Sequence, residues 1–116
     1  MRQLVRAWSI DAGFSLVDQT KIVTAASELA RNAVVYGGGG GATLEIVRDT
    51  DRTGLRLTFQ DSGPGIPDLE RAMQDGYSTG NGLGLGLGGA KRLSNEFHIE
   101  SCPGKGTRVV ITRWRN

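Results

Sequence analysis

A run of glycines late in the chain constrains the fold more than any other feature. The stretch GNGLGLGLGG, residues 80–89, contains six glycines among ten residues. Glycine inside a helix or strand costs backbone entropy and offers no side chain to bury, so most of this stretch is expected to be a loop. Leucines alternate with the glycines, whereas a plain flexible linker combines glycine with polar residues. The run therefore predicts a loop whose backbone comes close to another group.

Two helices are predicted before this loop. Apolar residues recur at helical spacing over residues 1–11 and again over residues 15–36. Ser15 or Asp18 is placed to cap the second helix, and the five glycines of residues 37–41 are expected to end it and form a loop. The residues expected to face the core are Leu4, Val5, Trp8 and Ala12 in the first helix and Ile22, Ala26, Leu29 and Ala33 in the second.

Four strands are predicted, in two pairs that flank the glycine-rich middle. Residues 42–48 and 55–60 form the first pair, and residues 97–101 and 108–114 form the second around a hairpin loop. Short helices are expected over residues 69–73 and 87–95. This order predicts a single α+β domain over residues 1–116, a two-layer sandwich with helices on one face of a mostly antiparallel sheet.

Composition argues against several classes of protein. No apolar run approaches the roughly 18 residues of a membrane span, and the first twenty residues do not have the pattern of a signal peptide. The 14 basic and 12 acidic residues are spread along the sequence with few aromatic residues, so no nucleic acid partner is expected. The single cysteine, Cys102, cannot form an internal disulfide. A reducing, cytoplasmic location is therefore expected.

Two well-known glycine motifs do not fit the run. A dinucleotide-binding loop joins the first strand and first helix of a βαβ unit, whereas this run lies late and follows no predicted strand directly. A Walker-type phosphate loop needs a lysine followed by serine or threonine, and Lys91 is followed by Arg92. Neither motif explains the glycines.

Three ordered stretches resemble the nucleotide-binding boxes of one superfamily. ELARNAVVYG, DSGPGIPD and STGNGLGLGLGGAKRL begin at Glu28, Asp61 and Ser78. They resemble the N, G1 and G2 boxes of the GHKL ATPases, the Bergerat fold, which include histidine-kinase catalytic domains and type II topoisomerases. FSLVDQTKIVTAASELARN, MQDGYSTG and GKGT resemble the RsbT-type switch kinases, a group of anti-sigma regulatory factors. These domains normally begin with an edge strand, which this chain is expected to lack.

The resemblance implies roles for two residues of the first box. Glu28 and Asn32 are four residues apart, so their side chains lie on the same helix face. In the family, the residue matching Asn32 binds the Mg²⁺ that bridges the triphosphate, and an amide oxygen is a suitable ligand for that ion. The residue matching Glu28 orients or deprotonates the attacking hydroxyl. Without the other boxes, the pair would be interpreted as a solvated helix face.

The resemblance also implies a pocket for adenine. Asp61 would accept a hydrogen bond from the adenine N6 amine, Gly63 and Gly65 would let the backbone approach the purine, and Ile66 would pack on the ring. Thr107, in GKGT, would complete the pocket from a distant strand. The other interpretation is that DSGPG is an ordinary turn and Thr107 an ordinary strand residue.

The glycine run is expected to hold the phosphates. Successive backbone N–H groups can point at phosphate oxygens, and the following helix presents its N-terminus to them. Leu83, Leu85 and Leu87 would anchor the loop, and residues 75–81 would form a lid. The nucleotide contacts expected here are Ser78, Thr79, Gly80, Gly82, Leu83, Gly84, Leu85 and Gly86.

The resemblance implies a serine/threonine protein kinase that uses ATP and Mg²⁺. Its expected substrate is a STAS-domain antagonist protein, and by binding it would activate a PP2C-type phosphatase in a bacterial stress pathway that controls a sigma factor. Two alternatives stay open: an ATP-binding module that binds a sigma factor with little kinase activity, and the catalytic fragment of a histidine kinase. No preceding helix carries a phosphoacceptor histidine, which argues against the second alternative, and His98 is expected to be structural.

Overall fold

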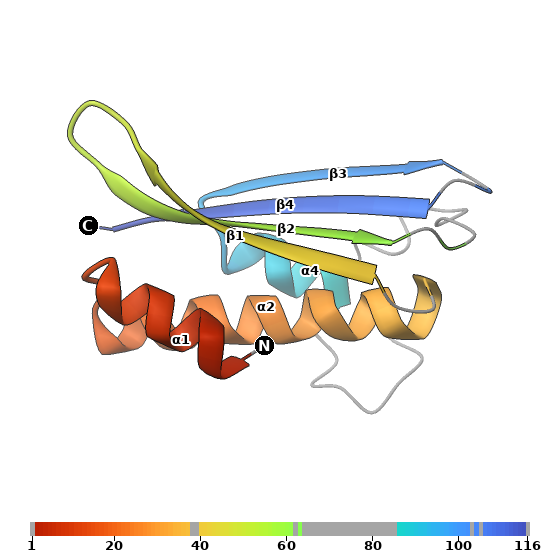
Figure 1. Ribbon diagram of the computed structural model, residues 1–116, viewed down its shortest axis with the longest axis horizontal. Coiled ribbons are helices and arrows are strands. Elements are labelled where there is room, and N and C mark those ends of the chain that lie inside the picture. The colour runs from red at the N-terminus through yellow and green to blue at the C-terminus, as the bar shows by residue number, and fades with distance from the viewer. Residues whose placement is uncertain are drawn as a thin grey trace.

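The computed structural model describes residues 2–37, 40–61, 63, 86–102, 104 and 106–115. Its helices are α1 (Arg2–Asp11), α2 (Leu16–Gly37) and α4 (Gly86–Arg92), and its strands are β1 (Gly40–Arg48), β2 (Thr53–Asp61), β3 (Glu96–Cys102) and β4 (Gly106–Trp114). The strands form one antiparallel sheet in the order β1-β2-β4-β3. These helices all lie on one side of the sheet (Figure 1).

This arrangement confirms the predicted α+β sandwich, with differences at the boundaries. The glycines of residues 37–41 were expected to form a loop, but Gly37 is the last residue of α2 and Gly40 is the first of β1. The helix predicted over residues 87–95 ends at Arg92. Asn95 lies beyond its end, and its side chain instead accepts a hydrogen bond from the backbone N–H of Trp114 in β4 at 2.7 Å. The helix predicted over residues 69–73 lies outside the described residues.

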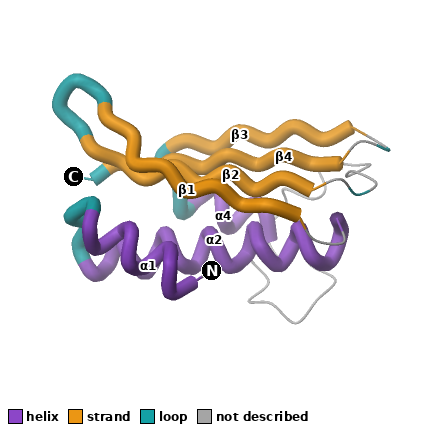
Figure 2. The backbone as a smooth tube through the Cα atoms, in the orientation of Figure 1, coloured by secondary structure: helices purple, strands orange, loops and turns teal. Residues whose placement is uncertain are grey.

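The core lies between α2 and the inner face of the sheet, as the layers in Figure 2 show. Alternate residues of β2 and β4 point inward, and burying each large aliphatic side chain contributes about 1.5–3 kcal/mol. Among the described residues, no helix combines the length and the apolar character needed to cross a membrane. The main buried apolar residues are Val5, Phe14, Ile22, Ala25, Ala26, Leu29, Leu55, Leu57, Phe59, Leu87, Ala90, Val109 and Ile111.

The predicted helix faces are largely confirmed. In α2, Ile22, Ala26 and Leu29 are buried, as expected, whereas the side chain of Ala33 lies outside the described residues. In α1, Val5 is buried and Trp8 is partly buried, and Ala12, just after the end of α1, is buried too, whereas Leu4 was expected to be buried and is 51% exposed. Ser9, one turn after Val5, is the other buried residue of α1 and donates a hydrogen bond to the Arg6 carbonyl at 2.7 Å. A small polar residue can occupy the buried face because its hydroxyl has a partner.

The start of α2 settles which residue caps it. Ser15 Oγ accepts a hydrogen bond from the Asp18 N–H at 3.2 Å, so Ser15 is the cap. The Asp18 side chain instead pairs with Arg113 of β4 at 2.9 Å, and both side chains are mostly buried. Arg113 also donates to the Leu93 carbonyl just after α4, at 2.9 Å. This network fixes α2 and the end of α4 against the sheet.

The β1–β2 hairpin turn is held against the end of β4. The guanidinium of Arg52 lies 4.1 Å from the ring centroid of Trp114, and it donates to Asp49 Oδ2 at 2.7 Å. The hydrogen bond from Arg52, with a second from the Thr50 N–H, lowers the pKa of the Asp49 carboxyl below its ordinary value. The Trp114 indole N–H donates to Glu96 at 2.6 Å. The contacts that hold the hairpin turn against β4 therefore involve Arg52 and Asp49, whose side chains are about half exposed to solvent.

Candidate functional site

Strands β2 and β3 end, and β4 begins, at the same end of the sheet (Figure 1). Three polar residues lie side by side there in the strand register. Asp61 of β2 lies opposite Thr107 of β4, and Thr107 lies opposite Ser101 of β3. Directly opposed residues of antiparallel strands project from the same face of the sheet. Asp61 and Thr107 share the inner face with core residues two positions away, so the row is on the helix side. The three residues line a pocket of about 170 Å³.

Hydrogen bonds define what this row can offer a ligand. Asp61 Oδ1 accepts the Gly63 N–H at 3.0 Å, and the Ser101 and Thr107 hydroxyl oxygens lie 2.9 Å apart. Thr107 is buried and Asp61 is half-buried. A carboxylate can accept a hydrogen bond from an amino group, and a hydroxyl beside it can contact the ring nitrogen next to that amino group. This chemistry suits a purine edge.

Gly40 allows β1 to approach the end of β2 closely. It lies opposite Asp61 in the register of the two strands. A Cβ atom at Gly40 would meet the Gln60 carbonyl oxygen and would lie 2.9 Å from Asp61 Cα. The neighbouring Gly41 would meet nothing within 4 Å. The backbone that carries Asp61 therefore requires glycine at position 40, and the sequence pattern alone gave no sign of this cross-strand requirement.

Glu28 is buried in α2 although its side chain ends in a carboxyl group. Only 5% of the residue is exposed, which rules out the solvated helix face that remained an alternative for this position. Its Oε2 pairs with Arg31, one turn later, at 3.1 Å. A buried carboxylate needs such a partner. Residues three apart on a helix are neighbours, so the sequence spacing of Glu28 and Arg31 already indicates that they can pair. Asn32 follows on the same helix, and its side chain lies outside the described residues.

The C-terminal half of α2 lies beneath the end of the sheet that carries Asp61 (Figure 1). Helix α4, which packs beside α2, starts at Gly86, so the last four residues of the glycine run are helical and not part of a loop, and Leu87 is buried. The described parts of the first box, the row of Asp61, Thr107 and Ser101, and the helical part of the third box therefore gather on one side of the molecule. The other expected contacts lie outside the described residues: Gly65, Ile66, Ser78, Thr79, Gly80, Gly82, Leu83, Gly84 and Leu85.

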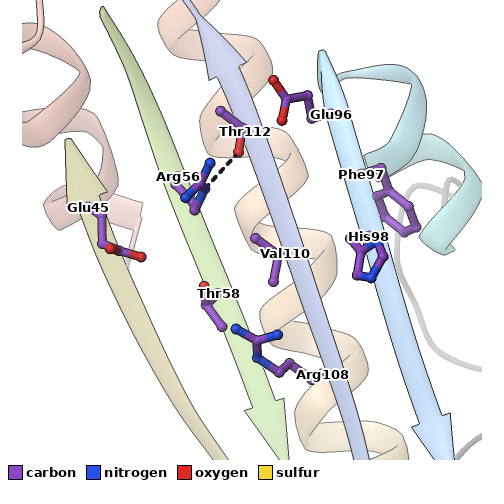
Figure 3. A pocket seen from close by; sticks show the side chains of 9 residues that line it. All are labelled: Glu45, Arg56, Thr58, Glu96, Phe97, His98, Arg108, Val110 and Thr112. Atoms are coloured by element: carbon purple, nitrogen blue, oxygen red, sulfur yellow. Dashed lines mark hydrogen bonds between the residues drawn. The ribbon is translucent and has the colours of Figure 1, made fainter. Parts of the chain in front are cut away.

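A second hollow, of about 410 Å³, lies on the opposite face of the sheet. Figure 3 shows its side chains in front of the sheet, with α2 behind. Arg56 lies across the floor and donates from Nε to Thr112 at 3.1 Å. His98 is exposed there and lies 3.5 Å from Glu100, in a surface pair that contributes little. This hollow is separated by the sheet from Glu28, so it is not part of the same site.

No group of three or more histidine, cysteine, aspartate or glutamate side chains forms a metal site in the described part of the chain. A metal ion at this site would therefore depend on other ligands. An amide oxygen, water and the phosphates of a nucleotide are the usual set for Mg²⁺, and Asn32 is the amide that the resemblance implies for this role.

Comparison with known proteins gives a consistent result. A family model described as histidine kinase-, DNA gyrase B-, and HSP90-like ATPase matches residues 17–115. The serine/threonine-protein kinase RsbT of Bacillus subtilis (strain 168) is 48% identical over 113 residues, which cover 97% of this chain and 85% of that protein. An anti-sigma F factor of Bacillus licheniformis is 30% identical over 97% of this chain and 80% of that protein.

Among solved structures, the mycobacterial sensor histidine kinase MprB matches with a TM-score of 0.59 and 21% sequence identity. The match covers 84% of this chain and 72% of that one. At this identity the likeness concerns the fold, which is the two-layer arrangement described above.

Proposed function

The chain belongs to the histidine kinase-, DNA gyrase B- and HSP90-like ATPases, and we propose that it is an ATP-dependent serine/threonine protein kinase. The observation that carries this proposal is the 48% identity, over 97% of the chain, to a protein named serine/threonine-protein kinase RsbT. The buried Glu28 and the row of Asp61 and Thr107 support it, because they offer a proton acceptor and a base-reading edge on one side of the molecule.

Adenine would bind at the end of the sheet. One oxygen of Asp61 is held by the Gly63 N–H, and the other would accept a hydrogen bond from the adenine N6 amine. Thr107 would contact the same edge of the base, with Gly65 and Ile66 against the ring. The backbone of residues 78–86 would hold the phosphates, because glycine allows consecutive N–H groups to converge on an anion.

Phosphoryl transfer would take place above α2. Asn32 would hold Mg²⁺, which supplies charge neutralisation at the triphosphate. The acceptor hydroxyl oxygen attacks the γ-phosphorus of ATP while the bond from that phosphorus to the β,γ-bridging oxygen breaks and ADP leaves. Glu28 accepts the hydroxyl proton. Arg31 holds one oxygen of Glu28 at 3.1 Å, so the carboxylate is fixed for this role rather than free to rotate.

The partners that we propose are those of a partner-switching pathway. The protein substrate would be a serine or threonine on a STAS-domain antagonist, and the chain would activate a PP2C-type phosphatase by binding it. The names of the relatives, RsbT and anti-sigma F factor, support a role in controlling a sigma factor. The anti-sigma F factors, at about 30% identity, also favour a second candidate, an ATP-binding module that binds a sigma factor directly.

Phosphate transfer to a purified STAS antagonist, measured with labelled ATP and Mg²⁺, tests the proposal. The substitution Glu28→Gln keeps the side-chain shape and removes the proton acceptor, so transfer should fall by on the order of 10²–10⁴-fold while ADP affinity persists. Glu45→Gln, on the exposed edge strand, is the matched control and should transfer at the native rate. Native rates in Glu28→Gln would reject the assignment of the base. ADP binding without any transfer by the native chain would favour the anti-sigma module.

A further inference from the structure

Two arginines from the central strands share the hollow on the face of the sheet away from the helices. Arg56 of β2 and Arg108 of β4 both line this space of about 410 Å³. The cross-strand pair of Thr58 and Val110 lies between them in the register. Figure 3 shows the guanidinium of Arg108 reaching from β4 toward Thr58, on the same side of the sheet as Arg56. The hollow therefore presents two guanidinium groups above a floor with a free-standing hydroxyl.

The glutamates of β3 beside the hollow are engaged by other groups. Glu96 accepts a hydrogen bond from the Trp114 indole N–H at 2.6 Å, which holds its carboxylate at one end of the hollow. Glu100 lies 3.5 Å from the ring nitrogen of His98 on the same strand. These contacts draw the two carboxylates away from the basic centre of the face.

The two arginines have no carboxylate partner in the described part of the chain. Glu45 lies opposite Arg56 in the register, and Glu100 lies opposite Arg108, yet no ion pair joins either couple. Arg56 instead donates from Nε to Thr112 Oγ1 at 3.1 Å, and Thr112 is only 2% exposed. This bond orients Arg56 and leaves its terminal Nη groups for a ligand, because a guanidinium has five N–H donors.

We propose that this hollow is a second binding site, for the dianion of a phosphate monoester. Guanidinium groups bind phosphate through paired N–H donors, and the Thr58 hydroxyl beside Arg108 offers a further donor. The two oxygens of a carboxylate are satisfied by one arginine, whereas the three terminal oxygens of a phosphate can use donors from both. The sheet separates the hollow from Glu28, so the inference does not depend on the proposed kinase activity.

Glu45 limits the affinity of this site. It is exposed on β1 and lines the hollow together with Arg56. Its carboxylate repels a phosphate, and at an open surface water and salt screen that repulsion only in part. The affinity for phosphate should therefore be modest, and removing the charge of Glu45 should raise it.

NMR titration of the isotope-labelled chain tests the site, with saturating ADP and Mg²⁺ present to occupy the proposed nucleotide site. The ligands are inorganic phosphate, acetate and N-acetyl-phosphoserine amide, which presents a phosphate monoester on a peptide backbone. We expect both phosphate ligands to shift the backbone amide signals of Thr58 and Val110. The dissociation constants should be on the order of 1 mM at low salt, and acetate should bind more weakly.

Three substitutions of charged residues locate the binding. Arg108 is exposed, so Arg108→Gln should keep the native Tm and weaken phosphate binding about 3- to 10-fold. Glu45→Gln should strengthen phosphate binding about twofold. Arg48→Gln removes the same charge as Arg108→Gln from an exposed position of β1 outside the hollow. It is the matched control and should bind phosphate as the native chain does.

The ligands also identify the source of the phosphate. Tighter binding of N-acetyl-phosphoserine amide than of inorganic phosphate would identify a phosphorylated protein segment, and equal binding would identify a small phosphate. Acetate that bound as tightly as phosphate would overturn the assignment of a phosphate site. Phosphate binding that was unchanged in Arg108→Gln, or absent when ADP is bound, would overturn the inference. Failure of the native chain to bind ADP would reject the proposed function alone, because the same titrations without ADP still decide the site.

Discussion

Replacing Gly40 by alanine should weaken both the fold and nucleotide binding. An alanine Cβ would meet the Gln60 carbonyl oxygen and would lie 2.9 Å from Asp61 Cα. These are backbone atoms, so the overlap cannot be relieved by turning a side chain, and β1 must move away from β2. Overpacking of this kind costs about 1–3 kcal/mol. Gly40 is the first residue of β1, where the strands can separate locally, so we expect a cost of about 1 kcal/mol.

The measurement combines thermal unfolding with ADP titration. A loss of about 1 kcal/mol in the free energy of unfolding should lower Tm by roughly 3–5 °C in a domain of this size. ADP affinity should fall by on the order of 3- to 10-fold, since displacing Asp61 weakens a hydrogen bond to a charged group.

Gly41→Ala is the matched control for Gly40→Ala. It adds the same methyl group one residue along the strand, where a Cβ would meet nothing within 4 Å, and Gly41 does not have a positive φ. Removing glycine at such a position reduces the entropy of the unfolded chain, so Gly41→Ala should leave Tm unchanged or slightly raised. If Gly40→Ala were as stable as Gly41→Ala and bound ADP with native affinity, the close approach of β1 to Asp61 would be refuted.

Three further predictions concern substitutions of single residues. Asp61→Asn should reduce ADP affinity at least tenfold in calorimetry, because its amide can present a donor to the adenine amine and the lost bond involves a charged group; Asp51→Asn, in the exposed hairpin turn, should bind normally. Gly54→Ala should lower the free energy of unfolding by about 1–3 kcal/mol, since its Cβ would lie 2.7 Å from Trp114 Cε3; an unchanged urea midpoint would contradict this. The pKa of Asp49 is lowered from 3.8 in the folded chain, so its contribution to stability is present above that pH and is lost as pH falls through the folded pKa. Asp49→Asn should therefore be less stable than the native chain at neutral pH, and the difference should shrink below pH 3.8.

Local pattern was sufficient to predict α1, α2, the four strands and the class of fold. The spacing of Ile22, Ala26 and Leu29 marks one face of a helix whatever surrounds it, and these residues are buried as expected. The order of the three motif stretches in the sequence likewise indicates the family. Positions at element ends were less predictable. Leu4 fits the helical spacing and is nevertheless exposed, because burial depends on which neighbouring element covers a face.

Only the tertiary structure decided which residues meet at the site. The register of β2, β4 and β3 brings Asp61, Thr107 and Ser101 into one row, although 40 residues separate Ser101 from Asp61 in the sequence. The same pairing makes Gly40, which the sequence presents as one glycine among five, a residue whose Cβ would overlap the backbone of β2. Strand register results from non-local pairing and shared burial, so the contacts that define a pocket across strands are not encoded in the local spacing of residues.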